Sequence, residues 1–125
     1  MTIVIDFDGV IHKYSKGWDD GSCYDEPVDG VLGFLQKLQI KGYSLVVQST
    51  RNPKQVVNWF NQHTFYRVME IPYGMDFWNE KEIIGITNHK LPAKIYIDDR
   101  GLKFEGKFDD EFMNAIDNFK TWQQD

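Results

Sequence analysis

The chain has 125 residues, of which 42% are hydrophobic and 26% are charged, so we expect one folded domain over residues 1–125 rather than a disordered segment. Its net charge of -5 argues against a broad nucleic-acid surface, which needs clustered Lys and Arg. The single cysteine, Cys23, excludes an internal disulfide and favours a reducing, cytoplasmic setting, and no apolar stretch approaches the roughly 20 residues of a membrane span.

The first third of the chain predicts a strand, a loop and a helix. Residues 2–5 are a continuous β-branched run, which is typical of a strand buried on both faces. Residues 11–27 are polar and aromatic without a regular period, so we expect a loop or short flap. Asp29 is predicted to cap a helix that ends at Gly42. The apolar face of this helix would consist of Leu32, Leu35 and Leu38.

The middle of the chain repeats this alternation. Residues 43–48 predict a second buried strand, and Asn52 followed by Pro53 is typical of a helix start. Residues 66–71 predict a third strand, and residues 82–87 predict either a fourth strand or a short helix. The apolar face of the second helix would consist of Val56, Val57 and Phe60.

The last part of the chain predicts a short strand at residues 94–97 and a helix capped by Asp109 or Asp110. This helix is expected to turn Phe112, Ile116 and Phe119 inward. Strands that alternate with helices indicate an α/β fold, a Rossmann-like parallel sheet with helices on both faces in three layers.

Polar side chains follow three of the predicted strands. Asp6 and Asp8 follow the first strand, residues 49–51 follow the second, and Asp98 and Asp99 follow the late strand. In a parallel sheet the ligand lies beyond the carboxyl ends of the strands, so these groups are expected at one edge. Two like charges about 4 Å apart repel by roughly 4 kcal/mol near a protein surface. An all-oxygen site of this kind suits Mg²⁺.

Four motifs occur in order between residues 2 and 100. Residues 6–10 (Asp-Phe-Asp-Gly-Val), Ser49 at the end of a strand, Lys90 shortly before a proline, and residues 95–100 (Ile-Tyr-Ile-Asp-Asp-Arg) carry them. Together they resemble the four motifs of the haloacid-dehalogenase superfamily. The resemblance implies a small HAD-like hydrolase domain and a phosphatase that uses Mg²⁺.

The resemblance also implies roles for the first motif. Asp6 would attack phosphorus and form an aspartyl-phosphate, a covalent step open to carboxylates. Asp8 would act as general acid and then as general base. Relatives that perform dehalogenation lack this second Asp, so its presence favours phosphate chemistry. Gly9 would let the backbone approach the phosphate closely.

The remaining motifs imply ligands for metal and phosphate. Asp6, the backbone carbonyl of Asp8, and Asp99 would hold Mg²⁺, with Asp98 in support. Ser49 and Lys90 would neutralise the transferring oxygens. Thr50 is an alternative to Ser49, and Lys81 and Lys94 are alternatives to Lys90. Arg51 is either a substrate ligand or a structural partner of the acidic groups.

The spacing of the motifs leaves no room for a large cap domain. About 40 residues separate Val10 from Ser49, and a similar number separates Ser49 from Lys90, partly used by core helices. A capless site is expected to take a large substrate or to be closed by another subunit of a homo-oligomer. The substrate class stays open between a nucleotide, a sugar phosphate and a phosphorylated macromolecule.

Two other classes of protein compete with a phosphatase. A receiver domain shares the parallel α/β plan, but its paired acids precede the phosphorylated Asp by about one βα unit. A binding protein that retains the fold without catalysis would be free to lose Asp8 or Lys90, and both are present.

Overall fold

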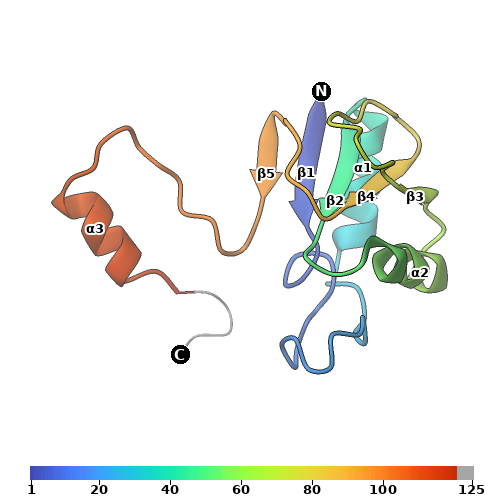
Figure 1. The fold of residues 1–125 in the computed structure, drawn as a ribbon, viewed down its shortest axis with the longest axis horizontal. Helices are drawn as coiled ribbons and strands as arrows, with labels where there is room; N and C mark the ends of the chain where they lie inside the picture. Colours follow the sequence, from blue (N-terminus) through green and yellow to red (C-terminus); the bar gives the residue numbers. More distant parts are fainter. Residues whose placement is uncertain (121–125) are drawn as a thin grey trace.

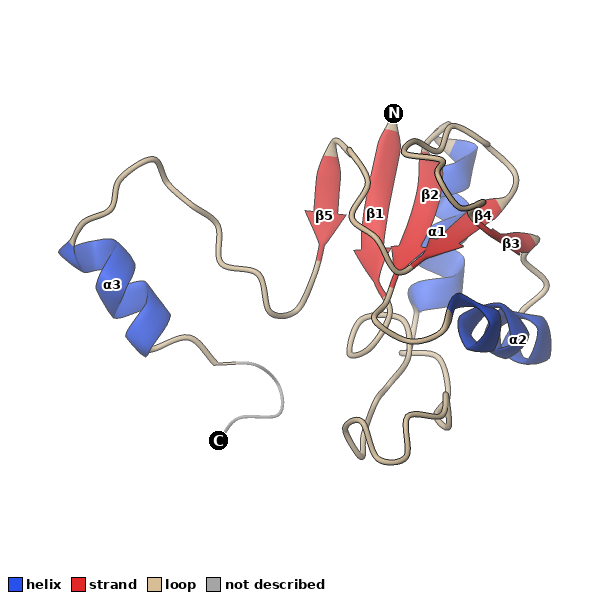
Figure 2. Cartoon of the chain, viewed as in Figure 1, coloured by secondary structure: helices blue, strands red, loops and turns tan. Residues whose placement is uncertain are grey.

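The computed structural model describes residues 1–120. Five parallel strands form one sheet in the order β3-β4-β2-β1-β5 (Figures 1 and 2). The strands are β1 (Thr2–Asp6), β2 (Ser44–Gln48), β3 (Val68–Glu70), β4 (Ile84–Thr87) and β5 (Ile95–Ile97). The helices are α1 (Val31–Ile40), α2 (Pro53–His63) and α3 (Asp110–Asp117). The predicted α/β class with a parallel sheet is therefore confirmed, and residues 82–87 supply a strand rather than a helix.

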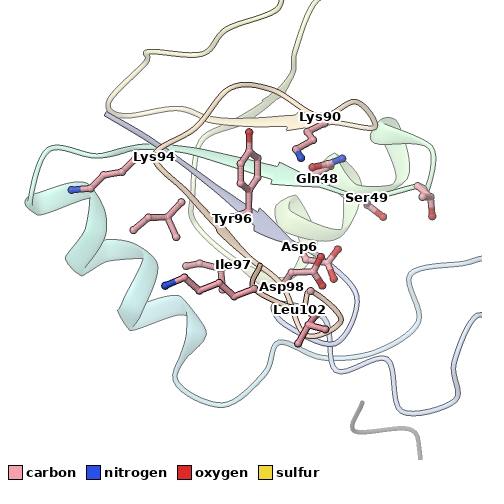
Figure 3. A pocket seen from close by; sticks show the side chains of 13 residues that line it. Asp6, Gln48, Ser49, Lys90, Lys94, Tyr96, Ile97, Asp98 and Leu102 are labelled. Atoms are coloured by element: carbon pink, nitrogen blue, oxygen red, sulfur yellow. The ribbon is translucent and has the colours of Figure 1, made fainter. Parts of the chain in front are cut away.

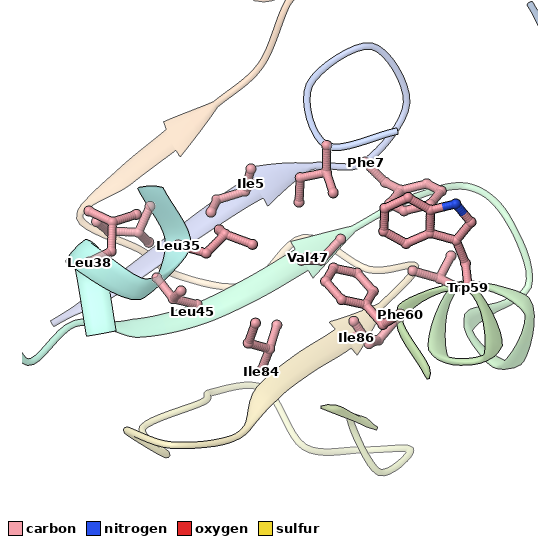
Figure 4. Packing of buried hydrophobic residues seen from close by; sticks show 13 residues of the cluster. Ile5, Phe7, Leu35, Leu38, Leu45, Val47, Trp59, Phe60, Ile84 and Ile86 are labelled. Atoms are coloured by element: carbon pink, nitrogen blue, oxygen red, sulfur yellow. The ribbon is translucent and has the colours of Figure 1, made fainter. Parts of the chain in front are cut away.

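One face of the sheet carries the main core. Leu35 and Leu38 of α1 and Trp59 and Phe60 of α2 pack on alternate residues of the strands (Figure 4). Those strand residues are Ile3, Ile5, Leu45, Val47, Ile84 and Ile86. Because side chains alternate along a strand, the residues between them face the other side.

The second face is covered differently from the prediction. Val4 and Val46 pack against Ile71, Trp78 and Leu91, which lie in the segments on either side of β4. In the described part of the chain, loop residues therefore take the place of the expected second helical layer. The indole of Trp78 is fixed there by its Nε1–H, which donates to the Ile83 carbonyl at 3.0 Å.

Gly85 makes this second face possible. A Cβ at Gly85 would lie 2.8 Å from side-chain atoms of both Ile71 and Trp78. We expect Gly85→Ala to lower the free energy of unfolding by about 1–3 kcal/mol, because the extra methyl overpacks the core. Chemical denaturation measures this change, and Gly33→Ala, at a position with open space, is the matched control. An unchanged stability of Gly85→Ala would contradict the close packing.

The helix ends confirm some predictions and correct others. Asn52 caps α2 by accepting from the Lys54 N–H at 3.0 Å, with Pro53 in the first turn, and Asp109 caps α3 through the Phe112 N–H at 3.0 Å. The prediction that Asp29 caps α1 is wrong. Gly30 occupies the N-cap position, and no side chain caps the helix there. Its φ of 83° is a backbone conformation that glycine adopts freely.

The prediction that α3 packs inward is also wrong. Figure 1 shows α3 standing away from the sheet at the end of a long connection. Ile116 is 49% exposed, and no residue of α3 is buried. The apolar period of α3 is present, but the helix does not reach the sheet of its own chain.

None of the helices in residues 1–120 is long and apolar enough to cross a membrane.

Candidate active site

Parallel pairing places the polar ends of β1, β2 and β5 side by side. Asp6 is paired with Gln48, and β5 lies on the other side of β1 and leads directly into Asp98. Figure 3 shows Asp6, Ser49, Lys90 and Asp98 around one pocket. The pocket has a volume of about 950 Å³. Thr50, Gln48 and Tyr96 also line it.

Asp6 and Asp98, which line this pocket, form a cluster of three carboxylates with Asp99. One oxygen each from Asp6, Asp98 and Asp99 lies within 4.8 Å of the others. Oδ1 of Asp99 is buried and has no hydrogen-bond partner among the described residues. A buried carboxylate oxygen without a partner is destabilising unless a cation or a donor satisfies it. The arrangement fits a hard cation bound by oxygen ligands, of which Mg²⁺ is a common example.

The electrostatics of Asp6 agree with this geometry. Burial, together with the nearby charges of Asp98, Asp99 and Asp8, raises the pKa of Asp6 from 3.8 to about 7. The Phe7 N–H opposes this shift in pKa by hydrogen bonding to the carboxylate. A bound cation would favour the ionised form of Asp6 at neutral pH.

Asp8 is not part of this cluster and does not line the pocket, and its carboxylate contacts other partners. Nε of Arg51 donates to both oxygens of Asp8 at 3.0 Å, and Nδ1 of His12 lies 3.0 Å from Oδ1. Nε2 of His12 accepts from the Asp25 N–H at 2.9 Å. Nε2 is therefore unprotonated, so Nδ1 carries the proton and donates it to Asp8. These contacts fix the orientation of the Asp8 carboxyl group.

Arg51 joins Asp8 to the flap, which we define as residues 11–27. Its guanidinium is fully buried, and Nη1 donates to the carbonyls of Gly21 and Ser22, the latter at 2.9 Å. The ring of Trp18 lies 4.7 Å from the guanidinium carbon. Arg51 does not line the pocket, so in this structure it supports Asp8 and the flap.

Ser49 and Thr50 both reach the pocket, so the structure keeps both alternatives. Ser49 is buried, and its Oγ accepts from the Arg51 N–H at 3.1 Å. Thr50 is exposed. Gly9 does not line the pocket and takes φ 82° in the turn after β1, a conformation that suits glycine.

The three candidate lysines separate by position. Nζ of Lys90 lies 4.8 Å from the centre of the Tyr96 ring, inside the pocket. Lys94 also lines the pocket, but its Nζ lies 5.6 Å from the centre of the Tyr43 ring. Tyr43 directly precedes β2, so it lies at the amino-terminal end of the strands, away from Asp6. Lys81 donates to the Gly42 carbonyl at 2.6 Å, also at the amino-terminal end of the strands.

Three site residues were not assigned from the sequence. Gln48 is paired with Asp6, and Tyr96 is paired with Val4, so both side chains lie on the same face of the sheet as Asp6. The alternation of side chains along the predicted strands could therefore have identified them. His12 had a weaker signal, because it follows Asp8 by four residues within an irregular loop.

No family model, no curated protein and no solved structure matches this chain.

Proposed function

We propose that the chain is a Mg²⁺-dependent phosphomonoester hydrolase of the haloacid-dehalogenase type, with Asp6 as the nucleophile. The observation that carries this proposal is the meeting of Asp6, Asp98 and Asp99 within 4.8 Å, with a buried unpaired oxygen on Asp99. Ser49 and Lys90 line the same pocket. The position beyond the carboxyl ends of parallel strands is where α/β folds bind ligands.

Asp6, Asp98, Asp99 and the backbone carbonyl of Asp8 would hold the metal. When bound, Mg²⁺ would neutralise negative charge on the phosphoryl oxygens. The set fits because it offers only oxygen ligands, and because at pH values above about 7 Asp6 is ionised beside two further acids.

The proposed reaction has two steps. In the first, an oxygen of Asp6 attacks phosphorus, the bond between phosphorus and the ester oxygen breaks, and Asp8 gives a proton to the leaving alcohol. In the second, water attacks the phosphorus of the aspartyl-phosphate, and Asp8 takes its proton. Phosphate leaves and Asp6 is restored. Ser49 and Lys90 donate hydrogen bonds to the transferring oxygens in both steps.

Asp8 does not line the pocket, but it lies close enough to Asp6 for their charges to interact. Arg51 and His12 hold its carboxyl group from two directions, so the group proposed to transfer protons has a fixed position next to Asp6 before substrate binds. The flap is the largest insertion around the site in residues 1–120, and the pocket of about 950 Å³ has no cap domain above it. We propose a substrate whose phosphate is terminal on a nucleotide, a sugar or a macromolecule.

The test is Mg²⁺-dependent release of phosphate from a panel of nucleotides, sugar phosphates, an aryl phosphate and a phosphopeptide. Asp8→Asn is expected to keep metal binding and to lose about 10²–10⁴-fold in kcat, because proton transfer is removed. Asp76→Asn, at an exposed position outside the pocket, is the matched control with unchanged kcat. Activity that survives a chelator, or an Asp8→Asn variant with full activity, would contradict the mechanism.

A further inference from the structure

Within residues 1–120, helix α3 packs only on the connection that leads to it. It contacts no other helix or strand, and its Met113 and Ile116 are 57% and 49% exposed. Phe112 contacts the rings of Phe104 and Phe108 in the preceding connection, with ring centroids 5.5 and 5.9 Å away. A helix of eight residues is marginal in water without tertiary contacts, since isolated helices need about 12–15 residues. Helix α3 therefore requires a surface to pack on.

The sheet leaves a matching surface open at β5. Ile95 and Ile97 lie on the same face as Ile3 and Ile5 of β1, and α1 packs on that face over β2 (Figure 4). Ile95 is 43% exposed at the edge of the sheet.

Helix α1 extends this open area with one of its flanks. Tyr66, which precedes β3, donates from its hydroxyl to the Leu32 carbonyl, so the Leu32 flank of α1 faces the β3 side. The opposite flank, with Phe34 and Lys41, is therefore turned toward β5. Phe34 is 50% exposed. We call the combined area the β5 surface. It consists of Phe34, Lys37, Lys41, Lys94, Ile95 and Ile97.

The charges of the two surfaces are complementary. The β5 surface carries three lysines and no acidic residue, although the chain has a net charge of -5. Helix α3 and its cap carry four acidic residues and no basic one. These are Asp109, Asp110, Glu111 and Asp117. The apolar residues of α3, which are flanked by acidic residues, therefore complement the apolar residues of the β5 surface, which are flanked by lysines.

We propose that α3 of one copy of the chain packs on the β5 surface of a second copy, and that the two copies exchange this helix reciprocally. The connection from β5 leads α3 away from its own sheet (Figures 1 and 2). Each copy therefore has an α3 that packs on no sheet and a β5 surface that no helix covers. Reciprocal exchange satisfies both in a closed two-fold dimer.

The exchange also concerns the pocket. Leu102 and Lys103, at the start of the connection to α3, line the pocket together with Asp6 and Lys90. Lys94, Ile95 and Ile97 of the β5 surface line the same pocket. In the dimer, α3 of the second copy would therefore border the candidate active site and hold the connection at Leu102 and Lys103 in place.

The first test is the molar mass of the full chain by light scattering after size exclusion. We expect twice the chain mass of 14.7 kDa. Ile116→Asp in α3 and Phe34→Asp on the β5 surface are each expected to give the monomer mass. Phe65→Asp, at a fully exposed aromatic beyond the other end of the sheet, is the matched control and stays dimeric. Circular dichroism shows that each variant is folded.

Mixing the two monomeric variants separates exchange from packing within one chain. The mixture contains an intact α3 on one variant and an intact β5 surface on the other, so it is expected to form a dimer at concentrations where neither variant does. A monomeric full chain, a dimer that both substitutions leave intact, or a mixture that stays monomeric would each overturn the proposal. None of these outcomes depends on phosphatase activity.

Discussion

At pH values above 7 and without Mg²⁺, the Asp6→Asn variant is expected to be more stable than the unchanged chain, although we expect it to be inactive. Burial and the charges of Asp98, Asp99 and Asp8 together raise the pKa of Asp6 from 3.8 to about 7. Folding at high pH therefore places an ionised Asp6 among like charges in a partly buried site. Asn removes this repulsion, which we put on the order of 2 kcal/mol after allowing for the solvent around a half-buried group.

The pH dependence follows from the direction of the shift. The folded chain keeps the Asp6 proton up to about pH 7, whereas the unfolded chain releases it near the ordinary value of 3.8. Between about pH 3.8 and about pH 7 the folded chain binds more protons than the unfolded chain. The contribution of Asp6 to the free energy of unfolding therefore falls as the pH rises through this range, and it levels off above about pH 7. In the Asp6→Asn variant this slope is absent.

Chemical denaturation at about pH 5 and about pH 8, in chelator, measures both effects. Mg²⁺ at 100 times its dissociation constant is expected to add about 2.7 kcal/mol to the unchanged chain and clearly less to Asp6→Asn. Asp76→Asn controls for the loss of one negative charge elsewhere on the surface. An Asp6→Asn variant that is less stable than the unchanged chain in chelator above pH 7 would show that the carboxylates are not under repulsion.

The sheet was predictable because its signals are local. The β-branched run at residues 2–5 and the apolar residues within 43–48 identified β1 and β2, and Asn52 with Pro53 identified the start of α2. The destination of α3 was not predictable in this way. Its 3.6-residue period indicates an apolar face, but a period does not say which surface covers that face, and in this structure its own sheet does not.

The site shows the same division. Parallel pairing follows from the alternation of strands and helices, so the meeting of Asp6 with Asp98 and Asp99 was predictable from sequence positions alone. The partners of Asp8 were not. His12 and the flap carbonyls reach Asp8 and Arg51 through an irregular loop with isolated bridges, and no sequence period describes such a loop.

Arg51 provides the second large prediction, because one buried guanidinium serves two structures. Nε binds both oxygens of Asp8, and Nη1 binds two carbonyls of the flap. A lysine retains the charge but has a single compact ammonium group, so it cannot span both sets of acceptors. Arg51→Lys is therefore expected to release the flap and to leave Asp8 free to rotate.

The expected result of Arg51→Lys is a loss of about 10²-fold in kcat, since a displacement of about 1 Å at a catalytic group has this effect. Proteolysis after Lys16, which lies in the flap, should become faster at the same time. Arg67→Lys, at an exposed position, is the matched control. A higher KM with an unchanged kcat and a protected flap would instead make Arg51 a substrate ligand, the other role that its place after Ser49 allows. Loss of kcat together with flap opening would assign Arg51 to the positioning of Asp8, because only that role connects the two measurements.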